Sequence, residues 1–370
     1  MTNICSRPRP NTGYRPSLPP DVGPAGPAHP DTDFPADPYP GAVPPFSFVH
    51  LDECSRPLTF DGCWRVGGTG GTELDLWLAE LGAPPLAARI PVLSYGSNRN
   101  PSKITWLRRV LGLTGPVVVL RARTEGLAAV WASGFRARDG QRSSVLGAAL
   151  GATERHALWM ATPEQVAVLD RCEGRGDRYR LARLGTGAVY TGDGMRVEAP
   201  WCYLGLSAIR RPLLVDGRPV RCADLGQAAA FALRGDPAPD DGLAATTVDG
   251  APAPDDWPAV VFVYGTLQPG QRAWPMLAGH AVESRRATVP GRVCDTGRGY
   301  PALLPGGTAR AAGWLVAVRD PAALLPRLDR YEGREYRRLR VAADDGTACW
   351  TYRWAGPEAA LTVLPRSLRQ

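Results

Sequence analysis

The hexapeptide LDRCEG at residues 169–174 returns as LDRYEG at residues 328–333, with one letter changed. Its glutamates, Glu173 and Glu332, occupy the same place in both copies, directly before a glycine. Apolar residues precede each hexapeptide at helical spacing, and a terminating glycine is typical of a helix C-terminus. The repeat therefore predicts two matched helices in two matched surroundings.

An apolar run and an aromatic turn precede each helix along the chain. They read IPVLSYGSNRNP at 90–101 and AVVFVYGTLQPG at 259–270. Each run is short and rich in β-branched residues, which predicts a buried strand followed by a turn. After each hexapeptide comes a basic strand that contains a tyrosine. The parallel order indicates a tandem duplication.

Composition divides the chain into five parts. Residues 1–45 hold 13 of the 37 prolines and are expected to form a disordered or extended tail. Residues 46–84 are an unassigned extension. Residues 85–234 and 258–370, the first and second segments, are the predicted domains. Between them, residues 235–257 contain PAPDD twice and have the composition of a solvated linker.

Charge and residue usage exclude several classes of function. The chain has 370 residues, 44% of them hydrophobic, and a net charge of +7. Its basic residues are scattered arginines with a single lysine, which argues against nucleic-acid binding. No apolar run approaches the ~18 residues of a membrane span, and no export signal is recognisable, so a cytoplasmic protein is expected. Eight cysteines and four histidines show no ligand spacing, so no metal site is predicted.

Two interpretations of the repeated glutamates stay open. Each could simply end a helix, with leucine packed inward and glycine as the cap. Each could also be catalytic, because the negative end of the helix dipole and partial burial both raise a carboxyl pKa towards the range that proton transfer needs. The Tyr-Gly-Ser and Tyr-Gly-Thr turns have the same two interpretations: a plain turn, or an anion-binding nest of backbone N–H groups.

Together these motifs resemble the γ-glutamylcyclotransferase family. The second segment matches over nearly its full length, through VFVYGTLQPG, GRGYPALLP, LDRYEGREYRR and the closing ACWTYRW, and is most similar to the γ-glutamylamine cyclotransferase-like branch. The first segment resembles the family through YGSNRNP and LDRCEGRGDRYR. It departs by having RSSVLGAAL where the second has GYPALLPGG, and Cys172 in place of Tyr331.

The resemblance implies an α+β fold with two tandem domains, each a small mixed β-barrel with flanking helices. It also implies a cofactor-independent transferase or lyase that acts on a small-molecule γ-glutamyl substrate. The α-amine of the substrate attacks its own γ-carbonyl, which releases 5-oxoproline and an amine or amino acid. Nothing in the sequence predicts the oligomeric state.

Residue roles follow from the same resemblance. Glu332, and Glu173 in the first copy, are the expected catalytic general acid and base. The expected substrate-binding residues are Tyr264, Gly265, Thr266, Leu267 and Tyr336 in the second segment, and Tyr95, Gly96, Ser97, Asn98 and Tyr179 in the first. Two alternatives remain: removal of a γ-glutamyl protecting group in a biosynthetic pathway, and a catalytically inactive binding or scaffold protein.

Overall fold

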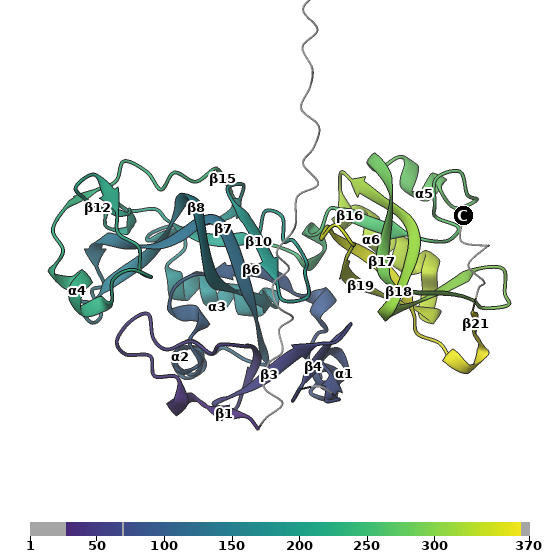
Figure 1. Ribbon diagram of the computed structural model, residues 1–370, viewed down its shortest axis with the longest axis horizontal. Coiled ribbons are helices and arrows are strands. Elements are labelled where there is room, and N and C mark those ends of the chain that lie inside the picture. Colours follow the sequence, from purple (N-terminus) through teal and green to yellow (C-terminus); the bar gives the residue numbers. More distant parts are fainter. Residues whose placement is uncertain (1–26, 69, 364–370) are drawn as a thin grey trace, which may run out of the picture.

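A computed structural model of the chain describes residues 27–68 and 70–363. Figure 1 shows two lobes side by side, a larger one coloured purple to teal and a smaller one coloured green to yellow, each with helices beside a β-sheet. The structure is therefore of the α+β class, as the resemblance implied, and it is rich in sheet.

The larger lobe holds a twelve-stranded sheet in the order β15-β9-β11-β6-β8-β7-β2-β3-β4-β5, with β1 paired to β3 and β10 paired to β7. These strands are β1 (His29–Pro30), β2 (Ser47–Leu51), β3 (Cys54–Phe60), β4 (Trp64–Val66), β5 (Thr72–Glu73), β6 (Ile90–Ser94), β7 (Val117–Phe135), β8 (Arg142–Ala161), β9 (Tyr179–Leu184), β10 (Ala188–Thr191), β11 (Trp201–Gly205) and β15 (Ala245–Thr247). A separate three-stranded sheet contains β12 (Leu213–Val215), β13 (Arg218–Pro219) and β14 (Asp236–Pro237). The helices of this lobe are α1 (Leu74–Glu80), α2 (Pro101–Leu111), α3 (Pro163–Glu173) and α4 (Gln227–Ala232).

The smaller lobe holds a six-stranded sheet in the order β19-β20-β16-β18-β17-β21. Its strands are β16 (Val260–Val263), β17 (Ala281–Asp295), β18 (Pro301–Val318), β19 (Tyr336–Ala342), β20 (Ala348–Trp354) and β21 (Thr362–Val363). Its helices are α5 (Pro275–Ala278) and α6 (Pro321–Glu332).

One strand arrangement occurs at the centre of both sheets. β6 runs antiparallel to β8 and parallel to β11, with Val92 opposite Trp201. β16 likewise runs antiparallel to β18 and parallel to β20, with Val261 opposite Trp350. Central strands are covered on both faces, which explains why the sequence of each is a continuous apolar run instead of an alternation. The turn after each central strand therefore leaves the sheet at a corresponding point.

The two helices that the repeated hexapeptide predicts are present as α3 and α6. Each begins at a polar N-cap whose side chain accepts a backbone N–H, Thr162 from Gln165 and Asp320 from Ala323, and each has proline at its first position. Each ends at a glycine whose φ is 66°, a conformation that a residue with a Cβ adopts only with strain. The glutamate is thus the last helical residue in both copies.

The expected closed barrels are not found. In the twelve-stranded sheet and in the six-stranded sheet, the first and last strands lie at opposite edges. Among residues 27–68 and 70–363, no hydrogen-bonded ladder joins the two edges of either sheet. The long strands are bent instead: register shifts interrupt the β7–β8 ladder and also the β17–β18 ladder, there between Pro290 and Gly291. Such irregularities curl a sheet without closing it, because each edge strand still lacks a partner on one side.

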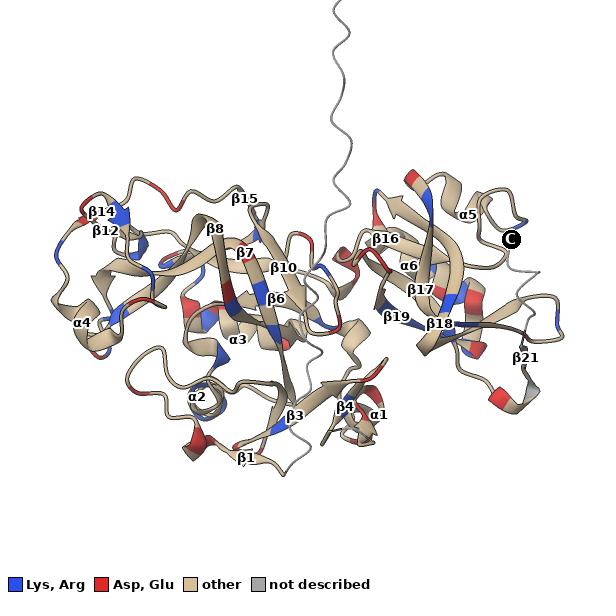
Figure 2. Ribbon diagram, viewed as in Figure 1, with Lys and Arg blue, Asp and Glu red and all other residues tan. Residues whose placement is uncertain are grey.

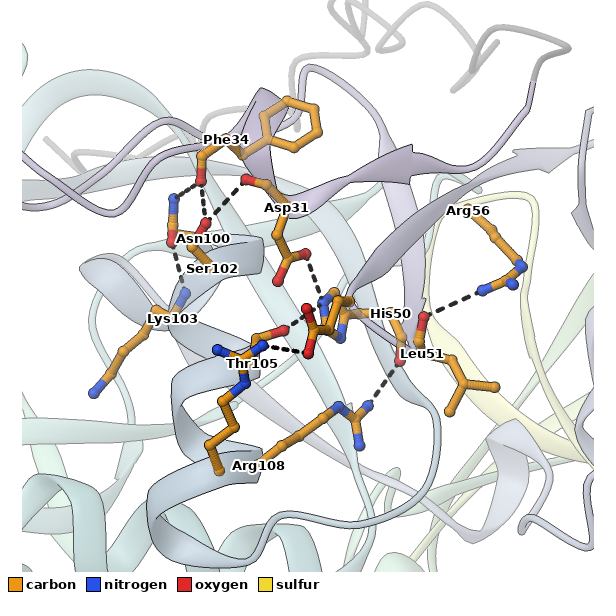
Figure 3. Close-up of polar contacts among 12 residues, drawn as sticks. Asp31, Phe34, His50, Leu51, Arg56, Asn100, Ser102, Lys103, Thr105 and Arg108 are labelled. Atoms are coloured by element: carbon orange, nitrogen blue, oxygen red, sulfur yellow. Dashed lines mark hydrogen bonds and ion pairs between the residues drawn. The ribbon is translucent and has the colours of Figure 1, made fainter.

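Residues 27–45, expected to belong to a disordered tail, are instead packed against the larger sheet. The side chains of Phe34 and Tyr39 are buried. Figure 3 shows how this stretch is attached: Ser102 at the start of α2 donates to the carbonyls of Asp31 and Phe34, and the Asp31 carboxylate bonds the ring of buried His50 at 2.9 Å. Proline prevents regular structure but not packing, so composition alone gave the wrong expectation here. The remainder of the expected tail, residues 1–26, lies outside the described part of the chain.

Two other expected boundaries also differ from the structure. The unassigned extension 46–84 supplies β2 to β5 and α1, and β2 pairs directly with β7. The expected linker 235–257 contributes β14 and β15, and β15 pairs with β9 as an edge strand. Both stretches therefore complete the larger lobe. Edge pairing satisfies backbone groups without requiring an apolar sequence, so the composition of these stretches did not reveal it.

Arg340 of β19 connects the lobes. Its guanidinium donates to the carbonyls of Leu86, Arg89, Pro254 and Trp257, at 3.1, 2.7, 2.8 and 3.2 Å. The fork of guanidinium donors suits such convergent carbonyls.

Within the described residues, no helix has the length and apolar character needed to cross a membrane.

Candidate functional site

Residues predicted for the second segment line one cavity of about 300 Å³. The turn after β16 supplies Tyr264, Gly265, Thr266 and Leu267, the end of α6 supplies Glu332, and the start of β19 supplies Tyr336. The structure thus brings together all six residues from three separate stretches of sequence.

Glu332 is the most perturbed acid of this cavity. Burial at the end of α6 raises its pKa to about 7, because a partly dehydrated carboxylate is less stable than the neutral acid. Among the described residues it forms no hydrogen bond or ion pair that would lower the pKa again. Glu332 can therefore both accept and release a proton near neutral pH.

The turn after β16 presents unused backbone donors. In the described part of the chain, the N–H groups of Gly265, Thr266 and Leu267 donate to no other protein group. Pro301 lies so close to Gly265 that an added Cβ would come within 2.9 Å of its Cγ. The hydroxyl groups of Thr266 and Tyr331 lie 2.9 Å apart across the cavity. This geometry suits the binding of a carboxylate or oxyanion.

Glu335, which the sequence reasoning missed, is a second acid of the same cavity. The hydroxyl of Tyr300 donates to it at 2.6 Å and Arg298 forms an ion pair with it. These contacts, led by the Tyr300 hydrogen bond, lower the pKa of Glu335, whereas burial raises that of Glu332. Two carboxyl groups with opposite shifts are suited to different roles, one ionised and one exchanging a proton.

Residues predicted for the first segment also line one cavity, of about 400 Å³. It includes Tyr95, Gly96, Ser97, Asn98, Glu173 and Tyr179. Asn98 donates to the Glu173 carboxylate at 2.7 Å. Burial raises the pKa of Glu173 despite that hydrogen bond and the nearby cations Lys103 and Arg178.

One hydrogen-bond framework supports both cavities. Tyr95 donates to the carbonyl of Tyr203, and Tyr264 donates to that of Tyr352, each at 2.7 Å. The hydroxyl groups of Tyr203 and Tyr352 in turn donate to Asp170 and Asp329 of the hexapeptides, again at 2.7 Å. The sequence reasoning missed these partners, although WCY at 201–203 and WTY at 350–352 repeat at matched positions.

Three further lining residues were not expected from the sequence. Lys103 follows Tyr95 by eight residues and Arg272 follows Tyr264 by the same eight, and each lines its cavity. This equal spacing was a readable signal. Tyr39 reaches the first cavity from the N-terminal stretch, with its hydroxyl 2.6 Å from that of Ser144, and no periodic pattern marked it.

Among the described residues, no group of three His, Cys, Asp or Glu could hold a metal ion.

Comparison with protein families locates a match in the second segment. A family model described as gamma-glutamyl cyclotransferase, AIG2-like, matches residues 261–367. The gamma-L-glutamyl-butirosin B gamma-glutamyl cyclotransferase of Niallia circulans is 33% identical over 73 residues, which are 20% of this chain and 47% of that protein. The chain thus spans about half the length of this relative. The second segment is similar to γ-glutamyl cyclotransferases, which confirms the resemblance predicted from its motifs.

Solved structures give weaker similarity. An AIG2-like protein from Mus musculus is 22% identical, with a TM-score of 0.23, and the match covers 30% of this chain and 98% of the mouse chain. YkqA from Bacillus subtilis is 14% identical, with a TM-score of 0.24, and the match covers 76% of this chain and 89% of that chain.

Proposed function

We propose that the second segment, residues 258–370, is a cyclotransferase domain that converts the γ-glutamyl group of a substrate to 5-oxoproline and releases the attached amine or amino acid. One observation carries the proposal. Glu332, with a pKa of about 7, lines the same cavity as the unused N–H groups of Gly265, Thr266 and Leu267. Similarity of residues 261–367 to γ-glutamyl cyclotransferases supports it.

The reaction balances within the substrate and one carboxyl group. Glu332 removes a proton from the α-ammonium, and the freed amine nitrogen forms a bond to the γ-carbonyl carbon. The bond from that carbon to the leaving nitrogen then breaks as Glu332 returns the proton to the leaving nitrogen. The attacking nitrogen gives up a second proton as the lactam forms, and the released amine takes it up to become an ammonium ion. No electron is gained or lost. Because nucleophile and carbonyl belong to one molecule, the cavity mainly has to hold the substrate in a folded conformation.

The other cavity residues have binding roles in this proposal. The N–H groups of the turn after β16 hold the α-carboxylate or the tetrahedral oxyanion, which are the acceptors such donors stabilise most. Tyr264 and Tyr336 form the walls, and each is fixed by its hydroxyl, Tyr336 through the carbonyl of Pro301 at 2.7 Å. Arg272 supplies a positive charge at the rim.

We further propose that the first segment is a second, more divergent domain of the same kind. The matched strand arrangement and the matched Tyr–Tyr–Asp hydrogen bonds support this. In this proposal Glu173, Tyr95, Gly96, Ser97, Asn98 and Tyr179 correspond to the residues of the second cavity. Residues 27–84 and 235–257 then belong to the first domain as additions to its sheet.

A second candidate substrate class is favoured by the name of the relative from Niallia circulans, which states that it acts on a γ-L-glutamyl derivative of butirosin B. The same reaction in this chain would then remove a γ-glutamyl group from a larger intermediate. The chemistry and the role of Glu332 are the same in both cases, so only the leaving amine differs.

Release of 5-oxoproline from a panel of substrates tests the proposal. The panel is γ-glutamyl-alanine, glutathione and γ-glutamyl-ε-lysine, each incubated with the full chain and with its Glu332→Gln and Glu173→Gln variants. Release that depends on Glu332 would establish the chemistry and assign it to the second cavity. Full release in a variant that carries both substitutions would refute the role of both glutamates. No release from the panel would direct the test to larger γ-glutamyl compounds, and a binding protein would be the conclusion if these also failed.

A further inference from the structure

The two cavities differ in charge. In the second cavity Glu332 and Glu335 accompany Arg272, and Arg298 pairs with Glu335, so acids and bases are nearly balanced. Glu173 is the only acid in the lining of the first cavity as described, where six bases accompany it: Lys103, Arg136, Arg138, Arg171, Arg178 and Arg210. Figure 2 shows acidic and basic segments spread over both lobes, so this difference is local to the cavities.

Two of the six cations are buried. Lys103 is 8% exposed and Arg210 is 7% exposed. Among the described residues neither has a carboxylate oxygen within ion-pair distance, and both share the more distant Glu173 as a counter-charge. Arg210 donates through Nη1 to Ser143 at 2.5 Å, but its Nε is buried without a partner. A single shared carboxylate offsets the cost of two buried cations only in part, and an anionic ligand would offset it further.

Lys103 has a position that fits ligand binding. Its backbone N–H donates to the side chain of Asn100, whereas its side chain extends away from the polar contacts drawn in Figure 3 and hydrogen-bonds Cys172. The Nζ atom lies 3.6 Å from the centre of the Trp106 ring, and the Arg138 guanidinium lies 5.1 Å from the same ring. Trp106, Lys103 and Arg138 thus form one wall that offers an aromatic surface beside two positive charges.

The other arginines line the same cavity. Arg136 and Arg138 share a single acid, Asp139, on the β7–β8 turn. Arg178 donates to the carbonyls of Cys172 and Glu173, which fixes it at the end of α3 beside the cavity. Even with Glu173 and Asp139 both ionised, bases remain in excess.

We propose that the first cavity binds a small ligand with at least two carboxylate or phosphate groups. The excess of cations, the two buried bases that share one carboxylate and a volume of about 400 Å³ carry this inference. A γ-glutamyl compound with an acidic second residue is the carboxylate form of such a ligand, and that choice alone rests on the proposed function. The anion site does not depend on turnover.

Isothermal titration calorimetry on the full-length Glu332→Gln variant tests the inference, because its second cavity should not consume the probes. A 5-oxoproline assay after each titration shows whether the first cavity has consumed them. The probes are γ-glutamyl-glutamate, with three carboxylates, γ-glutamyl-methylamide, with one, and inorganic pyrophosphate. We expect at least about tenfold tighter binding of γ-glutamyl-glutamate than of the methylamide, and steep weakening with added salt. Binding of pyrophosphate in place of γ-glutamyl-glutamate would support the site and identify phosphate as its ligand chemistry.

Substitutions locate the binding. Lys103→Met removes a buried charge at similar length and should weaken γ-glutamyl-glutamate binding about tenfold. Arg138→Ala, at an exposed position, should weaken it about threefold and provides the test if Lys103→Met fails to fold. The control is Arg109→Met, an exposed position on the same helix as Lys103 and outside both cavity linings, which should change nothing. Equal affinity for all probes, no saturable binding, or a loss caused by Arg272→Met in the second cavity but not by Lys103→Met or Arg138→Ala would overturn the inference. If binding fails while Glu332-dependent release of 5-oxoproline persists in the parent chain, only this inference fails.

Discussion

Directly before Tyr336 the second cavity has Glu335, and directly before Tyr179 the first cavity has Arg178. At this position the two halves differ in the sign of the charge on the cavity wall. Around it the buried hydrogen bonds from tyrosine to tyrosine to aspartate are the same in both, at the same 2.7 Å. The framework is retained because an unpaired buried polar group destabilises the fold, whereas the charge of the cavity wall is free to vary.

Glu332→Gln should reduce activity more than any other single substitution in either cavity. It removes the proton acceptor at nearly constant volume, so release of 5-oxoproline should fall by about 10²–10⁴-fold while the protein stays folded. Glu173→Gln is the matched control and should leave turnover of γ-glutamyl-alanine nearly unchanged if the second cavity does the work. Steady-state kinetics of the two variants compares the cavities directly, and equal losses would show that both are active.

Gly265→Ala should reduce activity next most strongly. The added Cβ would lie 2.9 Å from Cγ of Pro301, so the turn or Pro301 must move. A displacement of the donor N–H groups by a fraction of an ångström should lower kcat/KM by about 10–100-fold. Gly279→Ala is the control, because nothing lies within 4 Å of its added Cβ. An unaffected Gly265→Ala enzyme would argue against substrate binding at this turn.

The pH dependence of kcat/KM should show the ionisation of Glu332. A base with a pKa of about 7 is active when ionised, so the rate should rise with pH and level off above about pH 8. At pH 6 it should be about tenfold below the plateau. The measurement is repeated with substrates whose amine pKa values differ. The assignment would be contradicted if the midpoint of the rise in kcat/KM shifted with the pKa of the substrate amine. A profile without inflection between pH 6 and 8 would also contradict it.

The framework tyrosines should have the smallest effects. Tyr95→Phe leaves the buried carbonyl of Tyr203 without its partner and should lower the free energy of unfolding by about 1–3 kcal/mol. Tyr264→Phe removes the corresponding bond from a side chain that is less buried, where water can replace it, so about 1 kcal/mol is expected. Urea unfolding of both variants measures the difference. A larger loss for Tyr264→Phe would mean that the second cavity is the drier of the two.

Local patterns in the sequence predicted the parts of each site but not its walls. The strand, turn and helix of the second segment were expected from apolar spacing, Tyr-Gly and Leu-Asp-x-x-Glu-Gly, and all lie where they meet one cavity. Arg272 could have been found from its spacing to Tyr264. Tyr39 could not, because its contact with Ser144 spans 105 residues and its proline-rich surroundings have no period.

The sequence by itself determined that two matched helices would each end in a glutamate, that a tyrosine-glycine turn would follow each buried strand, and that the second segment would resemble γ-glutamyl cyclotransferases. These features depend on neighbouring residues, and helix and strand periodicity is a local property. Only the tertiary structure decided that the sheets stay open, that residues 27–45 and 235–257 complete the larger lobe, and that bases gather in large excess around the first cavity but not around the second. Sheet edges and cavity charge depend on residues far apart in sequence. Charges that the fold brings together in a buried cavity interact more strongly than charges exposed to water, because the effective dielectric constant is lower there.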